Sequence, residues 1–182
     1  MKISAGFVVT EPQKLGYLTY RKCAKSLCSF CDEVVVIFGR DEPESRKSLE
    51  QHFGNKIRVH VTNDWPVKYN YDCMRDHFQL IFDLCTGDIV FKIDSDHVFK
   101  TEHAKEIRKN ILDKSHIHHL VFSGIKFVKK PDYFFYSRKT EGIYGINVSL
   151  LKKDGIDFHI SNETGSNQPK FSSKVLKTRP LQ

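Results

Sequence analysis

The sequence has no apolar run that approaches the ~20 residues of a membrane-spanning helix. It also has no internal repeat and no low-complexity tract, and its composition is far from that of a disordered or collagen-like chain. No RNA-recognition, zinc-finger or basic-zipper pattern is present, so we expect no nucleic-acid partner. The composition is that of an ordinary globular protein, with 40% apolar and 28% charged residues in a chain of 182 residues. That length suits one domain with a substantial core.

The five cysteines form neither a disulfide framework nor a complete metal-binding pattern. Cys28 and Cys31 make one C-x-x-C pair, but no second pair and no H-x-x-x-H follows, so we expect this pair to be reduced and metal-free. The odd number of cysteines, and a first segment that suits a strand better than a signal peptide, predict free thiols in a reducing, cytoplasmic compartment. Cys73 and Cys85 stand alone in a predicted helix, where we expect small buried apolar side chains.

The chain carries a formal net charge of +7. A positive excess favours anionic partners, such as phosphates or an acidic membrane surface that the protein would contact peripherally. Simple solubility accounts for the same excess equally well, because the basic residues are spread along the chain instead of forming an arm. Charge alone leaves both interpretations open.

Strand and helix patterns alternate through the first hundred residues. Runs rich in β-branched and apolar residues predict strands at 3–9, 32–39, 56–62 and 89–93. Apolar residues at helical spacing predict helices at 16–28, 41–54 and 70–87. The continuous apolar run at 32–39 is typical of a strand covered on both faces. Together these patterns predict an α/β fold with a mostly parallel central sheet flanked by helices.

Polar residues follow three of the predicted strands at the point where each strand ends. They are Thr10 and Glu11, then Arg40 and Asp41, then Asp94 to Asp96. In open parallel sheets, ligands bind outside the carboxyl ends of the strands. We therefore expect these groups to line a common site at one edge of the sheet.

The second half of the chain has a different character. A polar amphipathic helix is predicted at 101–114, followed by two aromatic-rich strands within 118–139 and a glycine-rich stretch at 141–160. The segment 161–182 is polar and basic with little periodicity, which predicts a flexible loop or a poorly ordered end. We expect one domain over 1–160 and a polar basic tail over 161–182.

Asp94 and Asp96 stand one residue apart at the end of a strand whose sequence predicts burial. Two ionised carboxylates in a partly buried place repel each other and lose hydration unless a cation joins them. Either the strand reaches the surface here and water solvates both groups, or a cation is held between them. Carboxylate oxygens suit Mg²⁺ or Mn²⁺, which keeps open positions for a diphosphate and neutralises its charge as it leaves.

Several segments resemble family 2-like glycosyltransferases of the GT-A fold, which are DxD-containing enzymes that use nucleotide sugars. The hallmark of this family is a Gly-Asp turn, a hydrophobic strand and a DxD, and residues 85–99 are similar to it: CTGDIVFKIDSDHVF. The first strand, the second strand with its loop, and the helix before the DxD resemble the family segments: ISAGFVVT, CSFCDEVVVIFGRDEPES and YNYDCMRDHFQLIFDLCTGD. The resemblance implies a Rossmann-like three-layer α/β/α sandwich. It covers 1–100, the nucleotide-sugar-binding half, and in outline 101–160, the acceptor-side half.

The resemblance also implies roles for individual residues. Asp96 corresponds to the direct metal ligand, and Asp94 to the residue that touches the ribose or the water shell of the metal. Thr10 and Glu11 lie where the family holds the nucleoside. Arg75 matches the arginine that approaches the base or the phosphate, although an arginine on an amphipathic helix is as often a solvated charge.

One departure from the family pattern concerns the contact with the base. Family members place an aspartate directly after the second strand, where this sequence has Phe38 and Gly39. Asp41 is the nearest carboxylate, and we assign it to nucleotide-sugar binding with that departure in view. Trp65 could stack on a sugar ring, or it could be part of the core.

An inverting transferase needs a carboxylate that takes the proton of the acceptor hydroxyl. In the family this base follows the DxD, and the segment 154–165, DGIDFHISNETG, is similar to that region. The resemblance makes Glu163 the first candidate for the catalytic base and Asp157 the second. His159 could instead complete the metal site, as a histidine near the C-terminus does in some GT-A enzymes.

The predicted function is transfer of a sugar, with inversion, from a nucleotide-diphosphate donor to a glycan, a lipid-linked group or another acceptor. A UDP-sugar is the favoured donor, and Mn²⁺ or Mg²⁺ is the expected cofactor. Two alternatives stay open. The chain could bind nucleotide sugars without transferring them, or it could be a sugar-phosphate nucleotidyltransferase. That second class needs a glycine-rich basic loop after the first strand, where VVTEPQKLG has one late glycine.

Overall fold

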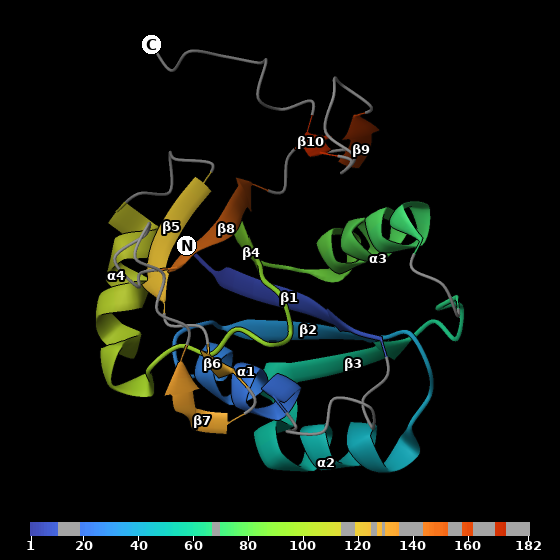
Figure 1. The fold of residues 1–182 in the computed structure, drawn as a ribbon, viewed down its shortest axis with the longest axis horizontal. Helices are drawn as coiled ribbons and strands as arrows, with labels where there is room; N and C mark the ends of the chain where they lie inside the picture. Colours follow the sequence, from blue (N-terminus) through green and yellow to red (C-terminus); the bar gives the residue numbers. More distant parts are fainter. Residues whose placement is uncertain are drawn as a thin grey trace.

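The computed structural model describes residues 1–10, 19–66, 70–113, 119–124, 127–128, 130–134, 144–152, 158–161 and 170–173. Their centre is a six-stranded sheet with the strand order β3-β2-β1-β4-β8-β5 (Figure 1). Four strands are parallel: β1 Ile3–Val9, β2 Glu33–Phe38, β3 Ile57–Val61 and β4 Ile89–Lys92. The strand β8, Tyr144–Lys152, runs antiparallel to both its neighbours, β4 and β5 (His119–Gly124). The predicted parallel sheet over the first hundred residues is confirmed.

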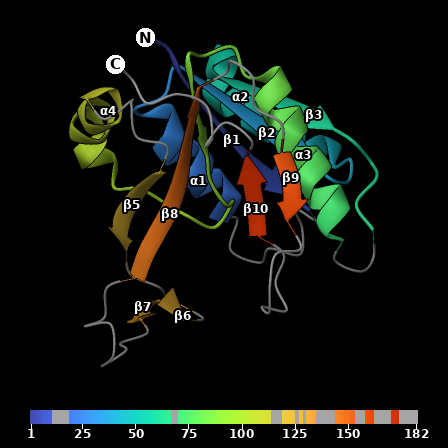
Figure 2. The same ribbon diagram turned by 90° about the horizontal axis from the view of Figure 1, so that it is seen from above.

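Helices cover both faces of this sheet. One face packs against α1 Thr19–Cys28, α2 Pro43–Phe53 and α4 Ala104–Asp113, and the other against α3 Tyr71–Leu84. Short 3-10 turns precede β3 and α4, at Gly54–Lys56 and Thr101–His103. The view from above shows α1 and α3 on opposite sides of β1 (Figure 2). The fold is therefore the three-layer α/β/α sandwich that the sequence predicted.

The strand β2 is central to the core because both of its faces are apolar. Val34, Val36 and Phe38 belong to the apolar cluster that contains α1 and α2. Val35 and Ile37 belong to the cluster on the α3 side. Successive side chains of a strand point to opposite faces, so a continuous apolar run is fully buried only between two layers. The prediction of a strand covered on both faces is confirmed.

The second half of the chain contains more strands than the sequence predicted. Two small antiparallel pairs lie outside the main sheet: β6 Phe127–Val128 with β7 Lys130–Phe134, and β9 Phe158–Ser161 with β10 Lys170–Ser173. The described residues of the range 118–139 thus form three strands, β5, β6 and β7, where the sequence predicted two. The predicted glycine-rich stretch contains β8, and β10 lies within the predicted tail.

Glycines at the ends of two predicted helices have different roles. Gly54 ends α2 as predicted, with a φ of 55° and with its backbone N–H donating to the carbonyl oxygen of Glu50. The helix α3 instead ends at Leu84, before Gly87. A Cβ on Gly87 would lie 2.6 Å from Ser4 Oγ and 2.7 Å from the Ser4 backbone nitrogen. Gly87 is therefore needed for the close approach of two chain segments, and it does not cap the helix.

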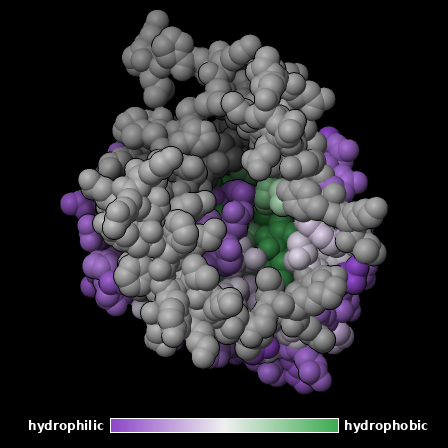
Figure 3. Space-filling model, in the orientation of Figure 1, coloured by the Kyte–Doolittle hydropathy of each residue, from purple (hydrophilic) through white to green (hydrophobic). Residues whose placement is uncertain are grey.

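Hydrophobic and hydrophilic side chains lie next to each other on one face of the molecule. In the space-filling view, hydrophobic residues gather near the middle of this face, with hydrophilic residues on one side of them (Figure 3). Met1 and Val98 are the exposed large apolar side chains within the described part of the chain. No helix in that part is both long and apolar enough to cross a membrane.

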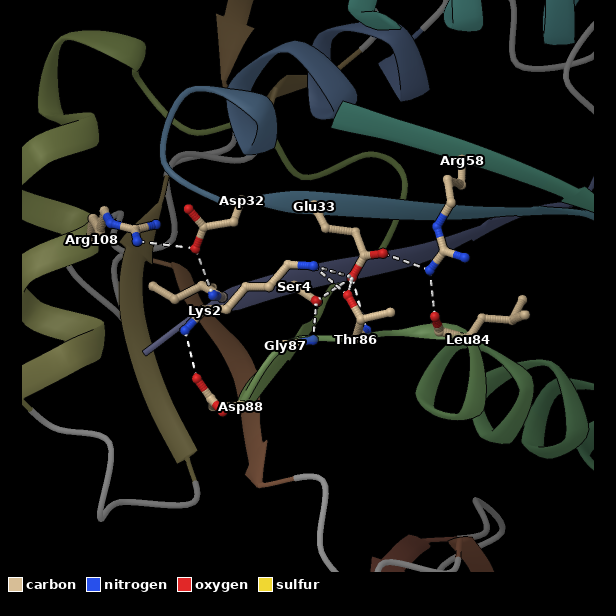
Figure 4. Close-up of polar contacts among 11 residues, drawn as sticks. Lys2, Ser4, Asp32, Glu33, Arg58, Leu84, Thr86, Gly87, Asp88 and Arg108 are labelled. Atoms are coloured by element: carbon tan, nitrogen blue, oxygen red, sulfur yellow. Dashed lines mark hydrogen bonds and ion pairs between the residues drawn. The ribbon is translucent and has the colours of Figure 1, made fainter. Parts of the chain in front are cut away.

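A polar cluster centred on Glu33 ties the amino ends of β1, β2 and β4 together (Figure 4). Glu33 is 7% exposed and accepts hydrogen bonds from Ser4 Oγ at 2.6 Å and from Thr86 N and Oγ1 at 2.8 and 2.9 Å. It also forms an ion pair with Arg58 Nη2 at 2.5 Å. Burial by itself raises the pKa of Glu33, but these hydrogen bonds and the charge of Arg58 outweigh it and lower the pKa to about 2. This cluster lies at the amino ends of the strands, away from the edge where ligands bind in such sheets.

Replacing Glu33 with glutamine should lower the free energy of unfolding at neutral pH by about 1–3 kcal/mol, because the buried donors lose an ionised acceptor. The loss should shrink in acid. A carboxyl group whose pKa is lower in the folded state stabilises the fold above its ordinary pKa of 4.5, and that contribution disappears as the pH falls toward 2. Urea unfolding at about pH 7 and about pH 3 measures both effects. Equal stability of wild type and Glu33→Gln near pH 7 would contradict the prediction, and the exposed Glu50→Gln is the control.

Candidate functional site at the carboxyl edge of the sheet

The carboxyl ends of the four parallel strands meet at one edge of the sheet. Val9, Phe38 and Val61, the last residues of β1, β2 and β3, are level with one another. The last residue of β4, Lys92, is level with Gly6 instead. The strand β4 therefore ends before the carboxyl end of β1 is reached. The turn that holds Asp94 and Asp96 begins beside the final residues of β1. The described residues of the polar strand ends that the sequence analysis grouped, which are all of them except Glu11, follow β1, β2 and β4 at this edge.

Asp94 and Asp96 are both exposed, with 60% and 70% of their side-chain surfaces open to solvent. A cation of the chain itself already contacts the first of them: Lys92 Nζ is 3.1 Å from Asp94 Oδ1. The same ammonium lies 4.0 Å from the centroid of the Phe78 ring, within the range of a cation–π contact. Solvent and Lys92 together explain how two like charges can stand side by side at the end of a buried strand.

The Asp94–Asp96 turn suits a hard divalent cation. Mg²⁺ in phosphate-binding sites takes one or two carboxylates from the protein and fills its other positions with water and phosphate oxygens. Two accessible carboxylates on one turn provide such a donor set. The neighbouring His97 has a buried Nδ1 without a hydrogen-bond partner in the described part of the structure, and its Nε2 is 3.8 Å from Asp96 Oδ1. One polar atom of this turn is thus left for a group outside the described residues.

Cys23 of the helix α1 contacts the backbone of the Asp94–Asp96 turn. Its thiol donates a hydrogen bond to the backbone carbonyl oxygen of Asp94, with a distance of 3.7 Å. Burial raises the pKa of Cys23 well above its ordinary value, and the carboxylates of Asp96 and Asp94 raise it further. Cys23 is therefore a neutral thiol that positions the backbone of the turn. It is not a nucleophile, since the thiolate form is disfavoured.

Gly39 allows Trp65 to lie across the end of β2. The backbone N–H of Trp65 donates to the Gly39 carbonyl oxygen at 3.2 Å, and a Cβ on Gly39 would lie only 2.7 Å from the Trp65 Cβ. Asp41 follows as an exposed residue whose backbone N–H donates to Asn63 Oδ1 at 2.7 Å. Directly after β2, where the family that the sequence resembles has an aspartate, this chain has Gly39 covered by Trp65. Trp65 is half-buried at this edge and does not belong to the apolar core clusters.

A polar cluster that the sequence analysis missed lies where β3 meets α3. His77, which is 2% exposed, has its Nε2 2.8 Å from Thr62 Oγ1 and 3.0 Å from Asp64 Oδ1. Its Nδ1 is 2.5 Å from the carbonyl oxygen of Cys73 and 3.4 Å from the Cys73 sulfur. The Trp65 ring meets the His77 ring edge to face, with centroids 5.3 Å apart. The sequence signal for this cluster was the four-residue spacing of Cys73 and His77 on one helix.

The cysteines only partly follow the prediction of buried apolar groups. Cys85 is fully buried, as expected. Cys73 is half-buried and has polar neighbours, so its expected role as a core side chain is wrong. Burial raises the pKa of the Cys73 thiol above its ordinary value, and the nearby carboxylates of Asp64 and Asp76 raise it further. None of the five thiols is in a disulfide.

The remaining predicted site residues are placed less directly. Arg75 lies on α3, and its described partners are two carboxylates of its own helix, Asp72 at 3.1 Å and Asp76 at 2.7 Å. His159 lies on β9, which packs beside α3 and is paired at that position with Ser172 of β10. Three further predicted residues lie outside the described residues: Glu11, Asp157 and Glu163. Thr10 directly follows β1 and is half-buried.

Comparison with known proteins shows the fold. No protein-family model and no curated protein sequence matches the chain. Among solved structures, S. aureus TarS 1–349 in complex with UDP-GlcNAc is similar, with a TM-score of 0.52 and 18% identity over 71% of this chain and 36% of that one. The 4-diphosphocytidyl-2C-methyl-D-erythritol synthase from Anaerococcus prevotii DSM 20548 has a TM-score of 0.54 and 12% identity over 84% of this chain and 70% of that one. The chain thus spans little more than a third of the TarS structure. It has a GT-A-like, Rossmann-type α/β fold.

Proposed function

We propose that this protein is a nucleotide-sugar-dependent glycosyltransferase of the family 2-like, GT-A type. It transfers a sugar, with inversion, from a UDP-sugar to a glycan, a lipid-linked group or another acceptor. The observation that carries the proposal is the position of Asp94 and Asp96, two exposed carboxylates on one turn at the carboxyl edge of a GT-A-like sheet. The fold shared with TarS, which was solved with UDP-GlcNAc, supports a nucleotide sugar as the class of ligand.

In this proposal Asp94 and Asp96 hold Mn²⁺ or Mg²⁺, which supplies positive charge for the diphosphate as it leaves. Lys92 keeps the Asp94 carboxylate in place through their 3.1 Å contact. If Asp94 turns toward a metal ion, the Lys92 ammonium stays beside the Phe78 ring as a further positive charge near the turn. Lys92 therefore adds one positive charge of the chain to the charge of the metal ion at this place.

The nucleoside is bound by the ends of β1 and β2 in this proposal. Thr10, Glu11 and Asp41 are the binding residues, and Trp65 adds an aromatic side chain at the same edge. Arg75 contributes to the base or phosphate only after it exchanges its two carboxylate partners on α3 for the ligand. That exchange makes Arg75 a weaker contributor than the carboxylates of the Asp94–Asp96 turn.

The catalytic base is proposed from the sequence resemblance. Glu163 takes the proton of the acceptor hydroxyl, with Asp157 as the second candidate for the same step. His159 is the candidate for an additional metal ligand, from the strand β9 beside α3. The domain limits are proposed in the same way, with 1–100 binding the donor, 101–160 facing the acceptor and a tail from 161 on.

Titration with nucleotide sugars tests the proposed donor. UDP-, GDP- and CMP-sugars are added to the full chain in a calorimeter, once with Mn²⁺ and once with EDTA. We expect a UDP-sugar to bind with Mn²⁺ and to lose about tenfold or more in affinity when the metal is removed, because the metal neutralises the diphosphate. Binding of equal strength with Mn²⁺ and with EDTA would remove the metal from the proposal. The absence of binding for every donor would remove the proposal itself.

A nucleotidyltransferase is the second candidate, because the fold similarity to the A. prevotii synthase covers 84% of this chain. The two reactions release different products. A nucleotidyltransferase transfers the nucleoside monophosphate part of a nucleoside triphosphate to a sugar phosphate and releases pyrophosphate, whereas a glycosyltransferase releases the nucleoside diphosphate of its donor. Pyrophosphate release from CTP or UTP with sugar phosphates would favour the second candidate. Donor binding without either product would favour a domain that binds nucleotide sugars without transferring them.

A further inference from the structure

The cluster where β3 meets α3 brings together three side chains that are common ligands of transition metals. One ligand atom from each of Asp64, Cys73 and His77 lies within 4.8 Å of the other two. Asp64 comes from the loop after β3, and the other two come from successive turns of α3. The Asp94–Asp96 turn offers carboxylate oxygens, which suit Mg²⁺ or Mn²⁺. A mixed nitrogen, sulfur and oxygen set favours a softer ion such as Zn²⁺.

The ring of His77 is held with one nitrogen turned toward Asp64. Its Nδ1 is 2.5 Å from the carbonyl oxygen of Cys73, and a carbonyl oxygen can only accept a hydrogen bond. Nδ1 therefore carries a hydrogen, and in the neutral ring Nε2 presents a lone pair. Metal-binding histidines in proteins commonly have this arrangement, in which the second ring nitrogen donates to a backbone carbonyl and so fixes the ring.

The surroundings of Nε2 call for a positive charge. Asp64 Oδ1 is 3.0 Å away, and a carboxylate has no hydrogen to donate. Two atoms with lone pairs repel each other at this distance. The single hydroxyl hydrogen of Thr62 can be donated to Nε2 or to the Phe38 carbonyl oxygen at 3.4 Å, and neither bond places a hydrogen between Nε2 and Asp64. The His77 side chain is 1% exposed, so water has little access to the ring. Either a second proton on the ring or a metal ion between Nε2 and the carboxylate relieves the repulsion.

We propose that Asp64, Cys73 and His77 bind a zinc-like divalent cation. Zinc bonds of about 2.0–2.3 Å in a tetrahedral site place neighbouring ligand atoms about 3.3–3.8 Å apart. The ligand atoms here are separated by up to 4.8 Å, so closure around an ion needs a shift of about 1 Å. Rotation of the exposed Asp64 and the half-buried Cys73 supplies that shift. As the sulfur binds the ion, the thiol proton of Cys73 passes to solvent.

A cation at this place fastens the loop after β3 to α3. Trp65 belongs to that loop and packs against His77, so the ion also fixes the aromatic side chain at the end of β2. The three ligands share no residue with the Asp94–Asp96 turn, and the binding of a metal by Cys73 can be measured whether or not the chain transfers a sugar.

Cobalt(II) is the probe for this site, because a thiolate ligand gives a sulfur-to-cobalt charge-transfer band in the near ultraviolet and carboxylate ligands do not. The full chain is reduced, stripped with EDTA and titrated with Co²⁺. We expect the band to appear at one equivalent and to disappear when Zn²⁺ is added. Cys73→Ser should abolish the band and weaken Zn²⁺ binding at least about tenfold. Cys28→Ser, which changes another half-buried thiol, should keep both.

Two results would overturn the proposal. Wild-type protein without the band would mean that Cys73 binds no metal ion. A band that survives Cys73→Ser and is lost in Cys28→Ser would move the metal to the C-x-x-C pair. Thermal unfolding adds a second measurement: Zn²⁺ should raise the unfolding temperature of the wild type and of Asp96→Asn alike, and should not raise that of Cys73→Ser. Circular dichroism of the same samples shows that the serine variant is folded.

Discussion

Replacing Asp96 with asparagine should lower the rate of sugar transfer by about 10²–10³ and remove the effect of Mn²⁺ on UDP binding. The metal supplies several kcal/mol of charge stabilisation, and each 1.36 kcal/mol corresponds to a factor of ten in rate. Asp96 is 70% exposed, and the contact that the structure describes for its carboxylate is with His97 Nε2 at 3.8 Å. The substitution should therefore leave the stability of the fold unchanged. Calorimetry with UDP and Mn²⁺, followed by a transfer assay, measures both effects.

Asp96 is a cleaner target than Asp94 for this test. Loss of the Asp94 carboxylate also frees Lys92, so its effect on the metal cannot be separated from its effect on that ammonium. Asp83→Asn is the matched control, because Asp83 is an exposed carboxylate on α3 that accepts a hydrogen bond from Gln79. If UDP binds equally well to wild type and Asp96→Asn, with and without Mn²⁺, the turn does not hold a metal.

The fold of the first hundred residues could be predicted because its signals are local. The apolar run of β2 is bounded by polar residues, and the N-cap of α3 is Asn70, whose side chain accepts from the backbone N–H groups of Asp72 and Cys73. Each such segment determines its own secondary structure. The right-handed connections of parallel strands then leave few arrangements of the sheet.

The strand β8 could not be predicted, because its partners are far away in the sequence. Its residue Ser149 pairs with Lys92 of β4 on one side and with His119 of β5 on the other. A strand that enters the sheet between β4 and β5 and reverses its direction is specified by tertiary packing. Gly142 and Gly145 interrupt the apolar pattern near its start, which hides the signal.

The candidate site was predictable where it depends on strand ends and not where it depends on loops. Asp94 comes shortly after the end of β4, which the sequence indicates. The register of β4 against β1 shows where in the sheet that end lies. The contacts of Lys92 with Asp94 and of Trp65 with His77 depend on how separate segments pack. No spacing in the sequence encodes them. Asp64 contacts His77 only because the loop after β3 returns to the first turns of α3.

Replacing Glu163 with glutamine should lower kcat by about 10²–10⁴, the usual effect of removing a general base, while donor binding stays intact. Glu163 belongs to a polar segment that follows Gly155 and Asp157 in the sequence, and a loop of this kind can close over a bound donor. Glutamine keeps the size of the side chain and removes its ability to take a proton at neutral pH. A transfer assay at saturating UDP-sugar, together with calorimetry for donor affinity, separates catalysis from binding.

Asp157→Asn is the comparison that assigns the base, and the exposed Glu44→Gln on α2 is the control for a carboxylate outside the site. If Glu163→Gln transfers the sugar at the wild-type rate and Asp157→Asn is slow, Asp157 is the general base. Loss of donor binding in Glu163→Gln would instead place this carboxylate near the metal, since a general base acts on the acceptor and not on the diphosphate. If neither variant is slow, the base is not in this segment. A reaction that retains configuration, or a chain that binds donors without transferring them, then becomes the better account.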